Sequence, residues 1–254
     1  MYNISFFILK RVINISENII LIGHRGANKE APENTLKSFR KAIELCADYI
    51  EFDIHLSKDG KIVIIHDENT LRTTGYDGLI KEMNLSELKK LDCGEGEKIP
   101  TIQELINIAK NKIGLQIEIK ATGLTEKLIN ILDSERLLES TIISSFNHEE
   151  LQKIKKLEPS LKISTLVPIN SKWPTEWNSK KELIDKTYEN GYYGIHPHYK
   201  LVDKKFIEYV HKLGLIVIPW TVDSRRVLKH LVNEGVDGII TNDIQKAKDI
   251  INYQ

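Results

Sequence analysis

Residues 49–54 read Tyr-Ile-Glu-Phe-Asp-Ile, and the alternation of apolar and acidic side chains in this stretch decides the fold. Successive side chains of a strand point to opposite faces, so the three apolar side chains share one face and Glu51 and Asp53 share the other. Residues 114–119 repeat the pattern, with Glu118 on the acidic face. In a parallel barrel, helices would cover the apolar faces, and the acids would point into the interior near the mouth.

The rest of the chain continues this alternation of strands and helices. Short β-branched runs predict strands at residues 19–23, 49–54, 62–65, 114–119, 141–145, 162–166, 192–195, 215–219 and 238–241. Amphipathic segments predict helices at residues 35–46, 102–110, 125–132, 148–157, 180–190, 203–213, 224–233 and 244–251. If residues 49–54 and 62–65 form one interrupted unit, the chain has eight βα repeats. That count and the length of 254 residues predict the α/β class and a (β/α)8 TIM barrel.

The predicted domain organisation is a single barrel at residues 19–254, preceded by an extension at residues 1–18. Residues 68–100 break the alternation, because they are polar and contain four glycines and one short helix signal at residues 86–91. We expect a small insertion there, after the strand region of the second repeat, on the rim where barrel loops form active sites. A second loop, residues 168–178, carries Trp173 and Trp177 and could overhang the same face.

Composition and charge exclude several classes of protein. The chain has 36 Lys and Arg against 36 Asp and Glu, and this balance argues against a nucleic-acid partner. No Gly-x-Gly-x-x-Gly motif follows the first strand, which argues against a dinucleotide-binding fold. Two cysteines, Cys46 and Cys93, are too few for a disulfide framework and are predicted to be unpaired thiols.

The N-terminal residues 1–15 carry a short apolar run, residues 4–9, that is too short to span a bilayer. Its cations follow the run and no small-residue cleavage site comes after it, so it does not resemble a secretory signal. We expect a short segment covering the bottom of the domain in a cytoplasmic protein without a transmembrane segment. The alternative is weak association with a membrane surface.

The acidic faces predict a metal site. Glu51, Asp53 and Glu118 would converge in a poorly solvated space, where each must protonate, pair or bind a cation. One divalent cation relieves the repulsion, and a ligand set of oxygens favours Mg²⁺ or Ca²⁺ over zinc. The alternative is that Glu51 or Glu118 merely pairs with Lys120 or Arg25.

Two histidines lie at neighbouring strand ends beside these acids. His24 follows the first strand, and His66 follows residues 62–65. Histidines so placed favour acid–base chemistry near neutral pH. Arg25 offers a planar fork for phosphate oxygens, and Lys120 offers a point charge. Cations, a divalent metal and two histidines around one mouth suit a reaction at phosphorus.

An ordered set of motifs then points to a family. The motifs are Gly23-His24-Arg25-Gly26, Pro32-Glu33-Asn34-Thr35, Glu51-x-Asp53, Asp59-Gly60, His66-Asp67, Arg72-Thr73-Thr74, Glu118-Ile119-Lys120, Trp220-Thr221-Val222 and Gly235-Val236-Asp237-Gly238-Ile239-Ile240-Thr241. From about residue 19 to the C-terminus, the chain resembles the glycerophosphodiester phosphodiesterases. The resemblance implies a (β/α)8 barrel that uses a divalent metal to hydrolyse glycerophosphodiesters to an alcohol and glycerol 3-phosphate.

The resemblance also implies a role for each matched residue. The expected roles are an acid–base pair at His24 and His66, metal ligands at Glu51, Asp53 and Glu118, phosphate contacts at Arg25 and Lys120, and a pocket wall at Trp220. For Trp220, ordinary core packing is the alternative. The sequence Thr241-Asn242-Asp243-Ile244 departs from the family, which often has Asp and then Pro after the Thr. We expect this departure to affect the shape of the loop rather than the chemistry.

The expected substrates are small head-group diesters such as glycerophosphocholine or glycerophosphoethanolamine. We expect His66 to act as the acid and His24 as the base, with either water or the glycerol 2-hydroxyl as nucleophile. A lysophospholipase-D-like enzyme and a non-catalytic phosphodiester-binding barrel are the alternatives. The residues His196-Pro197-His198 are similar to a zinc amidohydrolase motif, but no matching motif follows the first strand. We therefore expect residues 196–198 to form a loop, and the sequence predicts no oligomeric state.

Overall fold

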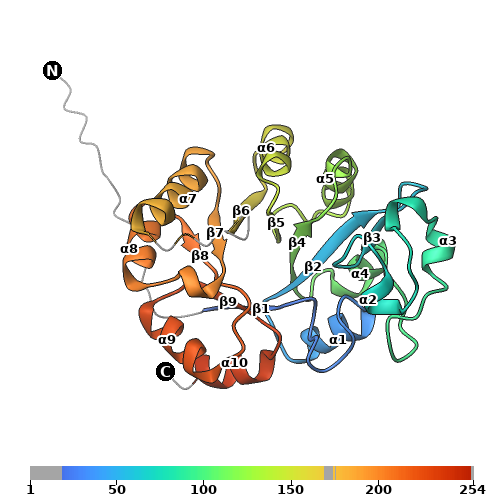
Figure 1. Cartoon of the computed structure of the whole chain (residues 1–254), viewed down its shortest axis with the longest axis horizontal. Helices are drawn as coiled ribbons and strands as arrows, with labels where there is room; N and C mark the ends of the chain where they lie inside the picture. Colours follow the sequence, from blue (N-terminus) through green and yellow to red (C-terminus); the bar gives the residue numbers. More distant parts are fainter. Residues whose placement is uncertain (1–18, 169–173, 175, 253–254) are drawn as a thin grey trace.

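A computed structural model describes residues 19–168, 174 and 176–252 (Figure 1). Eight parallel strands form a nearly closed barrel with helices outside it, which confirms the predicted (β/α)8 fold. The strands are β1 (Ile20–Gly23), β2 (Tyr49–Leu56), β4 (Gly114–Ile119), β5 (Thr141–Ser145), β6 (Lys162–Val167), β7 (Gly194–Pro197), β8 (Ile216–Val217) and β9 (Gly238–Thr241). Their order around the sheet is β8-β7-β6-β5-β4-β2-β1-β9.

The barrel closes between β8 and β9 through backbone hydrogen bonds. The amide of Asp237 donates to the carbonyl of Val217 (3.0 Å), and the amide of Ile240 donates to the carbonyl of Pro219 (3.0 Å). Pro219 has no N–H to donate, so the regular strand ends before it and β8 is shorter than the predicted residues 215–219.

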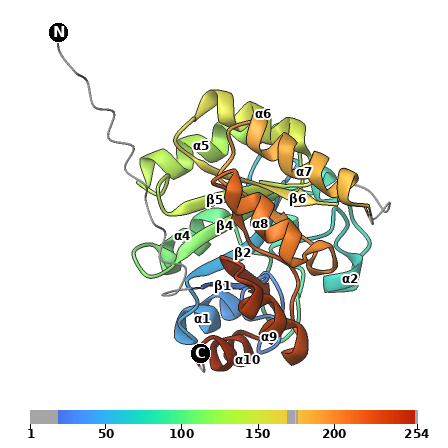
Figure 2. The ribbon, with the colours of Figure 1, turned by 90° about the vertical axis from the view of Figure 1, so that its left-hand side faces the viewer.

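Each barrel strand has a helix after it that packs outside the sheet, and for β2 this helix comes only after β3 and the inserted segment (Figure 2). These helices are α1 (Leu36–Glu44), α4 (Ile102–Ala109), α5 (Thr125–Ser134), α6 (His148–Leu157), α7 (Trp177–Glu189), α8 (Lys204–Lys212), α9 (Arg225–Glu234) and α10 (Ile244–Ile251). Thr35 begins α1 by accepting a hydrogen bond from the amide of Ser38, and Asn147 begins α6 in the same way. Gly235 ends α9 with φ of 89°, a left-handed conformation that glycine adopts without steric cost.

The register between β2 and β4 decides which side chains enter the barrel. Glu51 lies opposite Gln116, and Asp53 lies opposite Glu118. The intervening apolar residues of β2, which include Phe52, are fully buried in the main core between the sheet and the helices. The acids therefore face the interior, as the alternation predicts.

The inserted segment, residues 68–100, follows a strand outside the barrel. That strand, β3 (Ile62–Ile64), pairs antiparallel with β2, so it is not a ninth barrel strand. The segment contains α2 (Leu71–Thr74), the 3-10 turn η1 (Ile80–Glu82) and α3 (Leu85–Leu88), where only one helix near residues 86–91 was predicted. It packs on a small apolar cluster separate from the main core: Val63, Ile65, Ile80, Leu88 and Ile99.

The expectation of a loop at residues 196–198 is wrong. His196 and Pro197 belong to β7, which begins later and ends later than the predicted residues 192–195. Pro197 ends the strand without breaking the sheet, because the amide of His198 donates to the carbonyl of Val167 (2.8 Å) instead. A short 3-10 turn, η2 (Tyr199–Leu201), follows.

The remaining expectations concern the chain ends and the thiols. Cys46 and Cys93 are free, as predicted. The extension at residues 1–18, with its surface-anchor alternative, and Trp173 lie outside the described residues. In the part of the chain that the structure describes, no helix is both long enough and apolar enough to cross a bilayer.

Candidate active site

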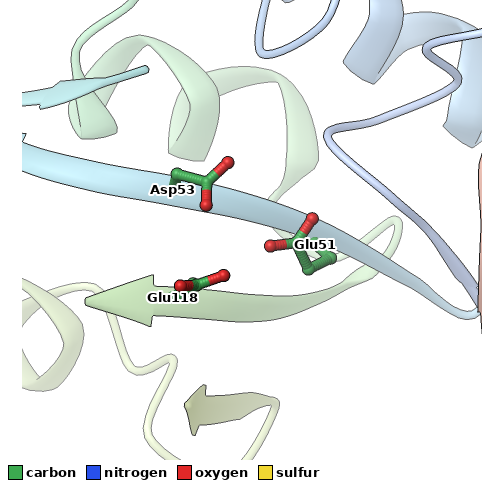
Figure 3. A group of neighbouring side chains, drawn as sticks. All are labelled: Glu51, Asp53 and Glu118. Atoms are coloured by element: carbon green, nitrogen blue, oxygen red, sulfur yellow. The ribbon is translucent and has the colours of Figure 1, made fainter. Parts of the chain in front are cut away.

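Three carboxylates meet inside the barrel mouth, where Glu51 and Asp53 of β2 turn toward Glu118 of β4 (Figure 3). One oxygen from each lies within 4.8 Å of the others. The residues are 3%, 1% and 7% exposed, respectively. The structure therefore brings together all three residues that the sequence proposed as metal ligands, in a place with little water to screen their charges.

The crowding changes the acidity of the carboxylates. Burial, with the charges of Asp53 and Glu118, raises the pKa of Glu51 well above its usual value. Burial and Asp53 raise the pKa of Glu118 to about 7, although Lys120 opposes this. Burial alone would raise the pKa of Asp53, but the charges of Lys120, His66 and Arg25 outweigh it and hold that pKa below its usual value. By themselves the three acids thus carry less than their full negative charge near neutral pH.

The chemistry of these donors fits a divalent cation. All of the donor atoms are carboxylate oxygens, the ligands that Mg²⁺ and Ca²⁺ prefer. Asp53 Oδ1 is buried and accepts no hydrogen bond from any described residue, so it has free capacity for a ligand. The ion pair between Glu118 and Lys120, which was the alternative to a metal site, is also present: Lys120 Nζ lies 2.5 Å from Glu118 Oε1 and 3.3 Å from Asp53 Oδ1.

A tight turn after β1 places His24 and Arg25 beside the acids. Arg25 has φ of 54°, and its amide donates to Glu51 Oε2 (2.8 Å). Gly26 follows with φ of 82°, and a Cβ there would come within 2.4 Å of Ser38 Oγ, so the turn requires glycine. Burial and the charge of Arg25 lower the pKa of His24 to about 4.

The loop after β9 contacts this turn directly. His24 Nδ1 lies 2.7 Å from Asn242 Oδ1, which also accepts a hydrogen bond from Asn28 Nδ2 (2.7 Å). Asn242 Nδ2 donates to Asp223 Oδ2 (2.6 Å). Asn242, which stands in the part of the loop that departs from the family pattern, therefore contacts a histidine of the site.

The second histidine lies across the mouth. His66 Nδ1 is 2.5 Å from Asp67 Oδ1, and its Nε2 is 3.1 Å from Lys120 Nζ. Burial lowers the pKa of His66, although the charge of Asp53 opposes this. The two histidines thus have different partners, an amide for His24 and a carboxylate for His66.

A pocket of about 260 Å³ opens between these groups. It is lined by His24, Arg25, Glu51, His66, Gln116, Glu118, Lys120, Phe146, Leu166, Trp220, Thr221 and Ile240. Trp220 packs edge-on against Phe146, with ring centroids 5.5 Å apart, and its Nε1 donates to the carbonyl of His196 (2.8 Å). Trp220 therefore lines the pocket and also packs within the barrel.

Sequence reasoning missed several side chains that hold the site. Asn34 is 4% exposed, and its Nδ2 donates to Asp53 Oδ2 (2.9 Å) from a backbone with φ of 56°. Glu33 and Arg72 form ion pairs beside the histidines. All three residues stand in the motifs that carry the family resemblance, and these motifs are the one sequence signal that could have identified them.

Comparisons with known proteins agree with this geometry. The model of the "Glycerophosphoryl diester phosphodiesterase family" matches residues 24–246. A glycerophosphodiester phosphodiesterase of Caldanaerobacter subterraneus subsp. tengcongensis is 40% identical over 245 residues, which cover 91% of this chain and 97% of that protein.

Two solved structures share the fold of this chain. A putative glycerophosphodiester phosphodiesterase from Galdieria sulphuraria has a TM-score of 0.85 and 28% identity, covering 93% of this chain and 99% of that one. A phosphodiesterase from Oleispira antarctica, solved with the product sn-glycerol-3-phosphate, has a TM-score of 0.81 and 31% identity over 91% of this chain and 96% of that one. The chain therefore belongs to the glycerophosphoryl diester phosphodiesterase family and is an enzyme of the phosphoric diester hydrolase class.

Proposed function

We propose that this enzyme hydrolyses small glycerophosphodiesters, such as glycerophosphocholine or glycerophosphoethanolamine, to an alcohol and glycerol 3-phosphate. The observation that carries the proposal is that a cluster of buried carboxylates and two differently partnered histidines open onto one pocket. The pocket is about 260 Å³, a size that suits a small substrate. The relative from Oleispira antarctica, solved with sn-glycerol-3-phosphate, supports the same choice.

In this proposal Glu51, Asp53 and Glu118 hold one divalent cation, Mg²⁺ or Ca²⁺. When bound, such an ion offsets negative charge on the phosphate. Arg25 and Lys120 line the same pocket and would bind phosphate oxygens. A bound phosphate oxygen would attract the ammonium of Lys120 away from His66, which would leave Nε2 of His66 free.

His24 suits the role of general base. Asn242 Oδ1 can only accept, so the hydrogen bond to His24 Nδ1 places a proton on Nδ1 and leaves a lone pair on Nε2 of the neutral ring. Because the pKa of His24 is about 4, the ring is neutral at pH 7 and ready to take a proton. The proton would come from water or from the substrate's glycerol 2-hydroxyl.

His66 suits the role of general acid. Asp67 accepts from His66 Nδ1 at 2.5 Å, and a carboxylate in this position stabilises the imidazolium that donates a proton from Nε2. The departing alkoxide needs this proton, since choline or ethanolamine leaves poorly as an anion. The partner of His24 is the neutral amide of Asn242, which does not stabilise a protonated ring in this way. This difference supports His66 as the acid and His24 as the base.

Two features of the wider chain belong to the same proposal. The catalytic unit is the barrel at residues 19–254, with residues 1–18 as a separate extension. The free thiols of Cys46 and Cys93 support a reducing compartment, so we place the enzyme in the cytoplasm.

The test is turnover of glycerophosphocholine, glycerophosphoethanolamine and a lysophosphatidylcholine, each measured after chelation and after addition of Mg²⁺ or Ca²⁺. The expected result is metal-dependent release of glycerol 3-phosphate from the first two substrates. Turnover confined to the lysophospholipid would replace the proposal with a lysophospholipase-D-like activity. Binding without turnover of any of the three would support a non-catalytic barrel.

A further inference from the structure

Arg72, in α2 of the inserted segment, lies between two carboxylates at the rim of the pocket. Its Nε donates to Asp67 Oδ2 (2.6 Å), and its NH2 lies 3.3 Å from Asp67 Oδ1. On the other side, its NH1 and NH2 donate to the two oxygens of Glu33 at 3.0 and 2.6 Å. One guanidinium thus holds both carboxylates with paired hydrogen bonds, a geometry that a lysine ammonium cannot reproduce.

Each of these carboxylates holds a residue of the pocket in turn. Asp67 Oδ1 lies 2.5 Å from His66 Nδ1, and Glu33 Oε1 accepts from Arg25 NH1 (2.9 Å). The contacts form a continuous chain from Arg25 through Glu33, Arg72 and Asp67 to His66. Its members come from the loop after β1, from the end of β3 and from α2, so the chain ties the inserted segment to the barrel mouth.

We propose that Arg72 is a positioning residue for catalysis: anchored by Glu33, it fixes the carboxylate of Asp67 and, through it, the ring of His66. The inference rests on the proposed function, because it assumes that His66 donates the proton. Asp67 is 29% exposed in its side chain and follows His66 directly, so without Arg72 its carboxylate is free to rotate into water. The hydrogen bonds from Arg72 and His66 also lower the pKa of Asp67 to about 2, as expected for a carboxylate held by two donors.

If Arg72 only stabilised the fold, its replacement would lower the stability of the protein rather than its turnover. Arg72 is 47% exposed in its side chain, and α2 has no buried residue, so removal of the guanidinium leaves no cavity. The turn around α2 keeps other bonds, such as that from Thr70 Oγ1 to the carbonyl of Tyr76 (2.6 Å). We therefore expect a large effect on turnover together with a small effect on unfolding.

The experiment compares Arg72→Met and Arg72→Lys with Lys89→Met. Lys89 is a matched control, because it lies in the same inserted segment and pairs with Glu104, outside the pocket. Two substrates are used: glycerophosphocholine and glycerol p-nitrophenyl phosphate, whose leaving group departs without a proton. The ring nitrogens of His66 are also observed by ¹⁵N NMR, which needs no turnover.

We expect Arg72→Met to lower kcat on glycerophosphocholine about ten- to a hundredfold, the scale for a misplaced catalytic group, with a much smaller change in KM. The loss should be smaller on the p-nitrophenyl ester, and guanidinium ion should restore part of it. The NMR signals of His66 should change from one tautomer to a mixture. Arg72→Lys should fall between wild type and Arg72→Met, and Lys89→Met should match wild type.

Equal losses on the two substrates, or an unchanged His66 tautomer in Arg72→Met, would overturn the inference. If Arg72→Met does not fold, the same comparisons with Arg72→Lys decide. A wild-type enzyme that turns over neither substrate contradicts the proposed function, whereas the NMR measurement still decides whether Arg72 orients His66.

Discussion

The division of labour between the two histidines gives the sharpest prediction. We expect His24→Ala to lower kcat at least about a hundredfold on glycerophosphocholine and on glycerol p-nitrophenyl phosphate alike, since both reactions need a base. We expect His66→Ala to lower kcat by a similar factor on glycerophosphocholine but much less on the p-nitrophenyl ester. That ester releases a stable anion, so an acid contributes little to its hydrolysis.

The lowered pKa of His24 gives the cost of using this residue as an acid. With a pKa of about 4, His24 is protonated at pH 7 in only about one molecule in a thousand. Using it as an acid would cost about 4 kcal/mol in populating the reactive form. Using it as a base costs nothing, because the neutral ring is the prevailing form. Burial lowers the pKa of His66 too, but the charge of Asp53 and the hydrogen bond to the carboxylate of Asp67 at 2.5 Å oppose this lowering and favour the charged ring.

The assay is steady-state release of choline or of p-nitrophenolate, with thermal unfolding recorded to verify that each variant folds. His230→Ala is the matched control, because His230 lies on α9, is 61% exposed in its side chain and does not line the pocket. An equal loss of kcat in His66→Ala on the p-nitrophenyl ester and on glycerophosphocholine would refute the role of His66 as the acid. Near-normal turnover in either variant would remove that histidine from the mechanism.

Three further predictions concern the metal and pH. EDTA should abolish activity, Mg²⁺ or Ca²⁺ should restore it, and full activity after thorough metal removal would refute the assignment of the carboxylates as ligands. In the metal-free protein, the pKa of Glu51 is raised in the folded state, so the folded chain keeps a proton that the unfolded chain releases. The free energy of unfolding should therefore fall as pH rises above about 4.3. Glu51→Gln should flatten this pH dependence in unfolding curves. A Glu51→Gln curve parallel to wild type would contradict this. The hydrogen bond from His211 to Asp237 raises the pKa of His211, so the charged His211 stabilises the fold below about pH 6.5 and this stabilisation is lost above the raised pKa. The difference in Tm between wild type and His211→Gln should therefore be larger at about pH 6 than at about pH 9. An equal difference at the two pH values would refute this role of His211.

Much of the fold was predictable because local patterns and the overall architecture agree. The strand at residues 114–119 was predicted with the bounds that the structure gives, since its alternation is regular and it begins at a glycine. The metal-ligand candidates came from the same alternation, which in a parallel barrel fixes both the face and the end of the sheet where a side chain lies. Antiparallel β3 was predictable only as an interruption, because a short apolar run carries no information about the direction of its partner.

The contacts that orient the site were not predictable in this way. Asn242 and His24 are 218 positions apart, and only closure of the barrel brings them together. Arg72 reaches Asp67 and Glu33 through the path of an irregular segment, which has no periodicity to read. His196 was misplaced because Pro197 argues against a strand. Pro197 is nevertheless the last residue of β7, and its carbonyl still accepts a hydrogen bond from the amide of Trp220 (3.0 Å).

The separate apolar cluster of the inserted segment has a consequence for engineering. Because Ile80, Leu88 and Ile99 pack on one another and on β3, the segment has its own small interior and does not complete that of the barrel. Its surface loops can therefore be redesigned, or the segment replaced by that of a related enzyme, without repacking the main core. The replacement must keep an arginine at the position of Arg72 and the polar contacts between the segment and the barrel, such as those of Lys89 with Glu104 and of Lys37 with Glu95.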